Sequence, residues 1–332
     1  MPMNVRAADD ASIALGARLL REGKLVAFPT ETVYGLGADA RNADAVRRMF
    51  AAKGRPEDHP VIVHVEDADA AASWASRMPD GARALARAFW PGPLTLIVPR
   101  APDVPDIVTG GQTSVGLRVP SHPVARALLH EFRGGVAAPS ANRFGHVSPT
   151  TARHVADDLG DALDLILDAG ACDVGIESTI VAFTTDTPML LRPGGIALDE
   201  IASALGRMPI ARDAVAAPRA SGTLTSHYAP RTPASLVASD ALRAELAQLE
   251  ERDERVAVLA RSVESPEAFD GVWIRAPSDA GAYAHALYAN LRALDAANAD
   301  VILIEQVPEA DAGTAISDRL ARATSGDADD RD

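Results

Sequence analysis

The sequence predicts an α/β protein with two domains, an N-terminal domain built on a twisted, mixed β-sheet and a smaller, doubly wound C-terminal domain. The length of 332 residues suggests two domains rather than one. Helix and strand patterns alternate through the first part of the chain and resume near residue 235 after a stretch without periodicity. Several N-terminal strand signals follow one another without a helix between them, which favours a mixed sheet over an all-parallel one.

The N-terminal elements follow from hydrophobic spacing. Residues 9–22 place Ile13, Ala17 and Leu20 on one helical face, and Gly23 ends the pattern. Further helices are expected near 43–52 and in two alanine-rich runs before Trp90, and strands at 25–28, 61–65, 94–98, 115–119, 136–138, 164–168, 178–183 and 189–192. Ser148 is expected to cap a helix that begins at Pro149.

The stretch 207–234 contains Pro, Gly, Ser and Thr but little periodicity, which is typical of a linker. It is long for a tether, and long loops are often functional. The pattern divides the chain into a domain at 1–206, the linker, a domain at 235–325 and a tail at 326–332 that we expect to be disordered. C-terminal strands are expected at 235–238, 255–260, 272–276 and 301–305, and helices at 239–251, 279–299 and 312–324.

Composition excludes several classes of protein. The net charge is -14. From Thr232 onward there are 20 acidic and 9 basic residues, which argues against a nucleic-acid surface there. No apolar run is long enough for a membrane helix, and the first residues lack the pattern of a signal peptide. The single cysteine, Cys172, reads as an ordinary loop thiol and excludes an intrachain disulfide, so a cytoplasmic location is expected.

Lys53 and Arg55 form the most informative pair of charges. The chain has only two lysines, Lys24 and Lys53, and uses arginine elsewhere. Lys53 therefore suggests a site that needs a compact ammonium, and Arg55 beside it adds a bidentate clamp. Such a pair suits a polyphosphate. The alternative is two solvated charges at a helix end, and we expect both to be surface cations in the free protein.

Other polar segments follow strands or open helices, where α/β proteins place ligands. They are 29–37, with two threonines and a tyrosine; 59–64, with two histidines; 114–118, which ends in an arginine; 138–150, with Ser140 and Asn142 before a helix start; and 177–179 with 191–195. Together they offer local cations and many hydroxyls but no catalytic triad, no HExxH and no metal cluster. Such a site binds and positions anions, as phosphoryl or nucleotidyl transfer requires.

A series of ordered motifs runs along the chain: PTETVYGLG, AKGRPEDHPVIVHV, FWPGPLTLIV, VGLRVPSHP, APSANRFGHVSPT, GIESTIV, LRPGGI and SHYAP. In these motifs the chain resembles the YrdC-like threonylcarbamoyl-AMP synthase family in its long, two-domain form. The resemblance implies a YrdC-like first domain, a Rossmann-like second domain and a linker that folds over the site. It implies a nucleotidyltransferase that converts L-threonine, bicarbonate or CO2, and ATP into threonylcarbamoyl-AMP and pyrophosphate. A separate transferase complex then modifies tRNA.

The resemblance also assigns residues. It places ATP at Lys53, Arg55, His59, Ser114, Ser140, Asn142, Ser148, Arg192 and Tyr228, with Lys53 and Arg55 as the catalytic pair. It places threonine at Thr32, His64, Arg118, Ala138 and Ser178, and it makes His227 and Tyr228 part of the lid. Mg²⁺ is expected on the ATP phosphates rather than on a side-chain cluster. The family often has Asn at His59, which leaves a direct nucleotide contact there open, and Ser-Pro-Gly where this chain has Ala220-Ser221-Gly222.

Two other functions compete with this one. An RNA-binding module could use the same cleft, but the overall acidity argues against it. A carbamoyl-adenylate enzyme of hydrogenase maturation would carry zinc-finger cysteines and an acylphosphatase-like segment, and this chain has neither. We therefore expect no stable nucleic-acid binding and no membrane association.

Overall fold

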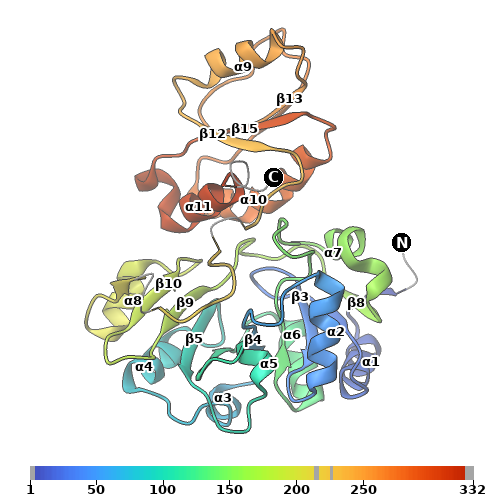
Figure 1. The fold of residues 1–332 in the computed structure, drawn as a ribbon, viewed down its shortest axis with the longest axis vertical. Coiled ribbons are helices and arrows are strands. Elements are labelled where there is room, and N and C mark those ends of the chain that lie inside the picture. The colour runs from blue at the N-terminus through green and yellow to red at the C-terminus, as the bar shows by residue number, and fades with distance from the viewer. Residues whose placement is uncertain (1–3, 213–216, 225–226, 326–332) are drawn as a thin grey trace. The chain divides into compact units, whose positions relative to one another are not determined.

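The computed structural model describes residues 4–212, 217–224 and 227–325, and the predicted tail at 326–332 lies outside them (Figure 1). The described chain forms two compact units. The first runs to Phe144 and includes Pro149–Thr223. The second consists of Gly145–Ser148 and the chain from Leu224 onward. Each unit is described by itself below.

The first unit is built on one mixed sheet. Its described strands lie in the order β1-β8-β2-β3-β7-β4-β6-β5-β9-β10-β11. Their bounds are β1 (Val5–Ala7), β2 (Val26–Phe28), β3 (Gly35–Asp39), β4 (Ile62–His64), β5 (Leu94–Pro99), β6 (Ser114–Arg118), β7 (Val136–Ala137), β8 (Leu165–Asp168), β9 (Thr179–Ala182), β10 (Met189–Arg192) and β11 (Ile210–Ala211). β4 pairs in parallel with β6, whereas β5 pairs antiparallel with it. The mixed sheet predicted from the sequence is thus confirmed.

Helices cover both faces of this sheet. They are α1 (Asp10–Arg21), α2 (Ala43–Lys53), α3 (Ala68–Ala72), α4 (Asp80–Phe89), α5 (Asp106–Thr109), α6 (Pro123–Phe132), α7 (Ala152–Leu159) and α8 (Leu198–Leu205). Successive strand residues point to opposite faces, so β2 and its neighbour Leu25 divide between two apolar clusters. Val26 and Phe28 pack with α1 and α6, whereas Leu25 and Ala27 join the cluster that contains α2 and α4.

Two local predictions were wrong. The helix expected at Ser148 begins at Ala152, capped by Thr151, because residues 145–148 pair instead with the second unit's chain at Ala229. No strand was predicted at 35–37, yet the glycines there belong to β3, which pairs with β2 and β7. Tertiary pairing overrides the weak strand propensity of glycine there. The strands β1 and β11 and the helices α5, α6 and α8 were not predicted.

The second unit is a small doubly wound domain, as predicted. Its strands are β12 (Ala234–Val237), β13 (Val256–Ala260), β14 (Val272–Arg275) and β15 (Val301–Glu305), all parallel and ordered β12-β15-β13-β14. α9 (Leu242–Glu250) covers one face, and α10 (Ala280–Asp295) and α11 (Glu309–Ala323) cover the other (Figure 1). None of the described helices of either unit is long and apolar enough to cross a membrane.

Candidate active site

Lys53 and Arg55 are buried, so the expectation that they are surface cations was wrong. Lys53 is the last residue of α2, and Gly54 ends the helix in the left-handed conformation at φ 64°. Lys53 is 3% exposed and Arg55 is 8% exposed. Burial, followed by repulsion from Arg55, holds the pKa of the Lys53 ammonium well below its ordinary value. A polyphosphate bound beside the pair would reverse that shift by supplying negative charge.

Lys53 connects the two motifs that the resemblance assigns to the nucleotide. Its ammonium donates to the backbone carbonyl of Ser140 at 2.5 Å and to that of Asn142. The Phe144 N–H in turn donates to the Lys53 carbonyl at 2.9 Å. The side chain therefore fixes the loop 140–144 against the end of α2. An ammonium has three donors, so one remains for a ligand oxygen when Lys53 is charged.

Arg55 lies beside His59 around one aromatic ring. Its guanidinium donates to the Pro60 carbonyl at 2.8 Å and lies 5.4 Å from the centroid of the Phe144 ring. The His59 ring meets the same ring edge-on at 5.3 Å. Burial and the nearby Arg55 lower the pKa of His59, so this imidazole is neutral near pH 7.

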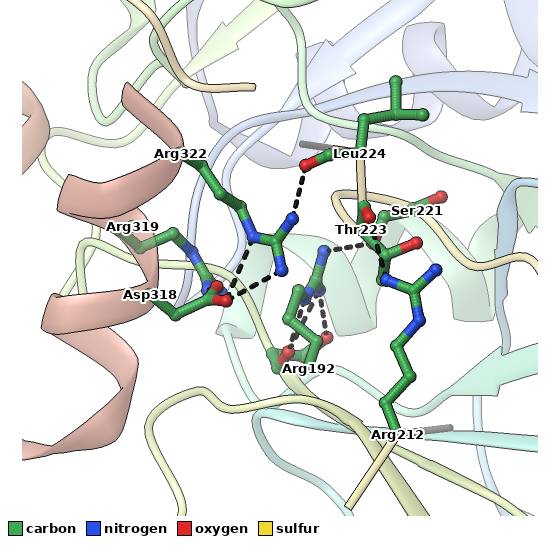
Figure 2. Close-up of polar contacts among 9 residues, drawn as sticks. Arg192, Arg212, Ser221, Thr223, Leu224, Asp318, Arg319 and Arg322 are labelled. Atoms are coloured by element: carbon green, nitrogen blue, oxygen red, sulfur yellow. Dashed lines mark hydrogen bonds and ion pairs between the residues drawn. The ribbon is translucent and has the colours of Figure 1, made fainter. Parts of the chain in front are cut away.

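Arg192, at the end of β10, reaches the same region from another strand. Its Nε and Nη2 donate to the Ser178 carbonyl at 3.1 and 3.0 Å, and Nη2 also reaches the Ser178 hydroxyl at 3.1 Å. Its Nη1 donates to the Ser221 carbonyl at 2.9 Å (Figure 2). The Ser221 hydroxyl donates to Pro60 O at 2.9 Å and lies 3.5 Å from Arg55 Nη2. Ser221 thus brings Arg55 and Arg192 together.

Residues 219–221, which we call the strap, hold this part of the linker on the first unit. The Arg219 backbone N–H donates to Gln112 Oε1 at 2.8 Å, and Gln112 Nε2 donates to the Arg219 carbonyl at 3.1 Å. Ala220 is buried in an apolar cluster that includes Ile62 and Ile180. Ser114 and Gly116 of β6 line a small cavity under the strap. The strap therefore covers the sheet face that carries the candidate site.

His64 and Arg118 lie side by side on that face. They are register partners at the ends of the parallel strands β4 and β6. His64 is 3% exposed and Arg118 is 4% exposed. Burial and the neighbouring guanidinium lower the pKa of His64 to about 3, so the imidazole is neutral at physiological pH.

The loop after β2 brings hydroxyls and a carboxylate to Arg118. Glu31 Oε1 lies 2.8 Å from Arg118 Nη2. The hydroxyls of Thr30 and Thr32 are 2.9 Å apart, and Thr30 also donates to the Val33 carbonyl at 2.6 Å. This turn fixes Glu31 and Thr32, both buried, next to each other.

Ser178 and Ala138 complete the set assigned to threonine. The Ser178 hydroxyl lies 2.7 Å from the Thr95 hydroxyl, at the start of β5 and β9, which are parallel neighbours. The Ala138 N–H donates at 3.0 Å to the carbonyl of Ile62, which is two residues before His64 on β4. Ala138 therefore lies beside that strand. These residues converge on adjacent strands, although they are spread over more than a hundred positions in the sequence.

Several buried polar atoms at this place lack a hydrogen-bond partner. Within the described residues they include Nδ1 of His64, Nε and Nη2 of Arg118, and Oε1 of Glu31. Arg118 Nη2 and Glu31 Oε1 form an ion pair but are not aligned as donor and acceptor. Buried polar groups are normally paired, so such a cluster indicates a place for a ligand.

Three residues assigned to the site belong to the second unit. Ser148 is buried there, and its carbonyl accepts from Arg292 Nε at 3.4 Å. The His227 N–H donates to the Arg322 carbonyl at 3.3 Å. Tyr228 is 1% exposed, with its ring stacked on Tyr288. The structure thus describes His227 and Tyr228 as packed residues of the second unit, and their lid role stays a prediction. Arg322 also pairs with Asp318 at 2.8 Å (Figure 2).

A metal site and a reactive thiol each require a particular arrangement of side chains. No group of three or more His, Cys, Asp or Glu residues in the described chain is arranged to hold a metal ion. Cys172 is fully buried, and burial raises the pKa of its thiol to about 12, so it stays protonated.

Comparison with known proteins identifies the family. Residues 18–194 match the family model Sua5_yciO_yrdC, described as "Telomere recombination", and residues 196–325 match the model described as "Threonylcarbamoyl-AMP synthase, C-terminal domain". A threonylcarbamoyl-AMP synthase of Bacillus subtilis is 39% identical over 96% of this chain and 94% of its own length. The chain belongs to the threonylcarbamoyl-AMP synthase family. A synthase of Pyrococcus abyssi is likewise 39% identical, over 95% of each chain.

A solved structure supports the same assignment and the same fold. Pyrococcus abyssi Sua5 in complex with L-threonine matches this structure with a TM-score of 0.88 at 38% identity, over 96% of both chains. Both the mixed α/β fold and the family predicted from the sequence are therefore confirmed.

Sequence reasoning missed four residues of this site. Glu31 stood in a recognised motif but was given no role, Thr95 and Gln112 were not singled out, and Ser221 was named only as part of a departure from the family's Ser-Pro-Gly. The carboxylate among hydroxyls in PTET was the available signal for Glu31. The other three depend on contacts between segments that are remote in the sequence, such as Gln112 with Arg219.

Proposed function

We propose that the first unit uses L-threonine, bicarbonate or CO2, and ATP to make threonylcarbamoyl-AMP and pyrophosphate. The observation that carries this proposal is the cluster of unsatisfied buried atoms on Arg118, Glu31 and His64. A hydroxy amino acid offers a carboxylate, an ammonium and a hydroxyl, which are the partners that these atoms lack. Arg118 suits the carboxylate, and neutral His64 suits the hydroxyl.

The chemistry requires positioning more than attack by the protein. The threonine amine captures CO2 to give a carbamate, a carbamate oxygen attacks the α-phosphorus of ATP, and pyrophosphate leaves. Lys53, Arg55 and Arg192 would bind the phosphates and neutralise their charge. In the free protein the strap occupies Arg55 and Arg192 through Ser221, so ATP has to displace these contacts.

The remaining assignments are carried by the resemblance. We propose that Ser114, Ser140 and Asn142 contribute to the ATP site, and that Thr32, Ala138 and Ser178 contribute to the threonine site. Mg²⁺ would arrive on the ATP phosphates and balance their charge. The labile product would pass to a tRNA-modifying transferase complex.

The test is reconstitution with all three substrates. Pyrophosphate and the AMP adduct are followed with threonine, bicarbonate or ATP left out in turn. The proposal expects both products only with the complete mixture. Pyrophosphate release that does not depend on threonine would contradict it. Filter binding of RNA at varied salt tests the rival reading, against which the net charge of -14 argues.

A further inference from the structure

Glu31 is a buried carboxylate whose hydrogen bonding is incomplete. Glu31 as a whole residue is 5% exposed. Oε2 accepts the Ser121 N–H at 3.1 Å, while Oε1 lies 2.8 Å from Arg118 Nη2 without forming an aligned hydrogen bond. Burial opposes its charge, but attraction to Arg118 outweighs burial and lowers the pKa of Glu31, so it stays an anion.

Arg118 has the complementary deficit. Its Nε and Nη2 also lack hydrogen-bond partners among the described residues, although the side chain is 5% exposed. The site therefore holds adjacent positive and negative poles, each with unused hydrogen-bonding capacity. A buried ion pair in this state is incompletely compensated for its lost hydration. A ligand that carries both charges would satisfy both poles.

A zwitterion fits these poles better than an anion does. A simple carboxylate would satisfy Arg118 but would meet repulsion from Glu31. An α-amino acid places its ammonium next to its carboxylate, as the two poles lie next to each other. We propose that Glu31 binds the α-ammonium group of L-threonine and thereby selects the zwitterion over anions of the same shape. This inference rests on the proposed function.

Two other roles for Glu31 fit less well. A general base for the amine needs a pKa near the working pH, and the pKa of Glu31 is lowered instead. An anchor that only orients Arg118 is expected to form an aligned hydrogen bond with it, whereas Glu31 Oε1 lies 2.8 Å from Arg118 Nη2 without one. A carboxylate with only a structural role is expected to have its oxygens fully hydrogen-bonded. Glu305 of the second unit is such a case, because it accepts from five different donors on Ser239, Arg261, Ser262 and Val263.

The test compares ligands that differ in one charged group. Calorimetric titration measures the binding of L-threonine, of (R)-3-hydroxybutyrate, which lacks the ammonium, and of L-threoninol, which lacks the carboxylate. The wild type should prefer L-threonine over 3-hydroxybutyrate by roughly tenfold or more, the scale of a charged hydrogen bond. In Glu31→Gln this preference should disappear, because L-threonine and L-threoninol weaken by a similar factor while 3-hydroxybutyrate does not. Glu31→Asp, which keeps the charge, should restore part of the preference.

The outcomes separate the possibilities. Equal weakening of L-threonine and 3-hydroxybutyrate in Glu31→Gln would show that Glu31 only positions Arg118, and it would overturn the inference. A wild type that binds no L-threonine would overturn the proposed function as well. Glu305→Gln, which removes a buried carboxylate in the other unit, is the matched control and should leave all three affinities unchanged. Unfolding curves identify any variant that fails to fold.

Discussion

Two buried carboxylates, Glu31 in the first unit and Glu305 in the second, differ in how completely they are bonded. Glu305 ends β15, where it accepts the N–H groups of Arg261 and Ser262 at 2.6 and 2.8 Å and the Ser239 hydroxyl at 2.8 Å. Glu31 has one aligned donor and one misaligned ion pair. Doubly wound domains usually bind ligands at the carboxyl edge of the sheet, yet here the protein's own side chain fills that place.

The difference shows how to distinguish a ligand site from a structural one. A buried charge that is saturated by the protein stabilises the fold. A buried charge with unsatisfied hydrogen-bonding groups lowers the stability of the fold unless a bound ligand satisfies those groups. This criterion supports the proposal that the first unit binds the substrates, and it assigns the loops around Glu305 a structural role.

The largest effect is expected from Arg118→Ala. The change removes the proposed carboxylate partner and leaves Glu31 buried without its counter-ion, a loss of about 2–5 kcal/mol. The threonine concentration needed for half-maximal pyrophosphate release should rise roughly a hundredfold, while the ATP requirement should change far less. Arg87→Ala, an exposed arginine on α4, is the control. An equal rise for both substrates would place Arg118 between them or make it structural.

Removal of Lys53 or Arg55 should act mainly on ATP. Lys53→Met and Arg55→Ala are each expected to weaken ATP use by roughly 1–3 kcal/mol. Both side chains are buried and bonded to neighbouring loops. The thermal stability of the two variants should therefore also fall, contrary to the expectation for surface cations. Lys24→Met, which changes the other lysine, should alter neither quantity. Unchanged pyrophosphate release in both variants would remove Lys53 and Arg55 from the site.

Glu305→Gln should destabilise the second unit without changing substrate affinity. The loss is expected to be about 2 kcal/mol, the scale of hydrogen bonds to a charged group. Burial opposes the charge, but bonds from Ser262 and its neighbours outweigh it and lower the pKa from 4.5 to about 2. The contribution is therefore complete above pH 4.5 and is lost as the pH falls toward 2. Acid unfolding followed by circular dichroism checks this, and an unchanged curve for the variant would contradict it.

The smallest effect is expected from Gln112→Ala. This change removes two hydrogen bonds that hold the strap, so limited proteolysis within 207–234 should become a few times faster. ATP and threonine together should slow cleavage in the wild type if the linker closes over them. Asn4→Ala, which removes side-chain bonds remote from the strap, controls for general loosening. A linker that is cut equally fast with and without ligands would be only a tether.

Sequence predicted the elements well where one pattern dominates. The strand at 301–305 coincides with β15, and the helix at 9–22 with α1, because apolar spacing alone determines them. The start of α7 was missed because residues 145–148 pair with a segment about eighty positions away. The family motifs predicted most candidate site residues. The burial of Lys53 and the role of Glu31 could not be predicted, since both depend on which distant groups surround each charge.

Hydrogen exchange of the full chain with and without L-threonine tests the central claim most directly. If the unsaturated cluster is the threonine site, L-threonine should slow exchange of the backbone amides in 30–34 and at Ser121. The amides of residues 261–263, already bonded to Glu305, should exchange at the same rate with and without the ligand. Protection confined to 261–263, or no protection in 30–34 at saturating L-threonine, would contradict the account.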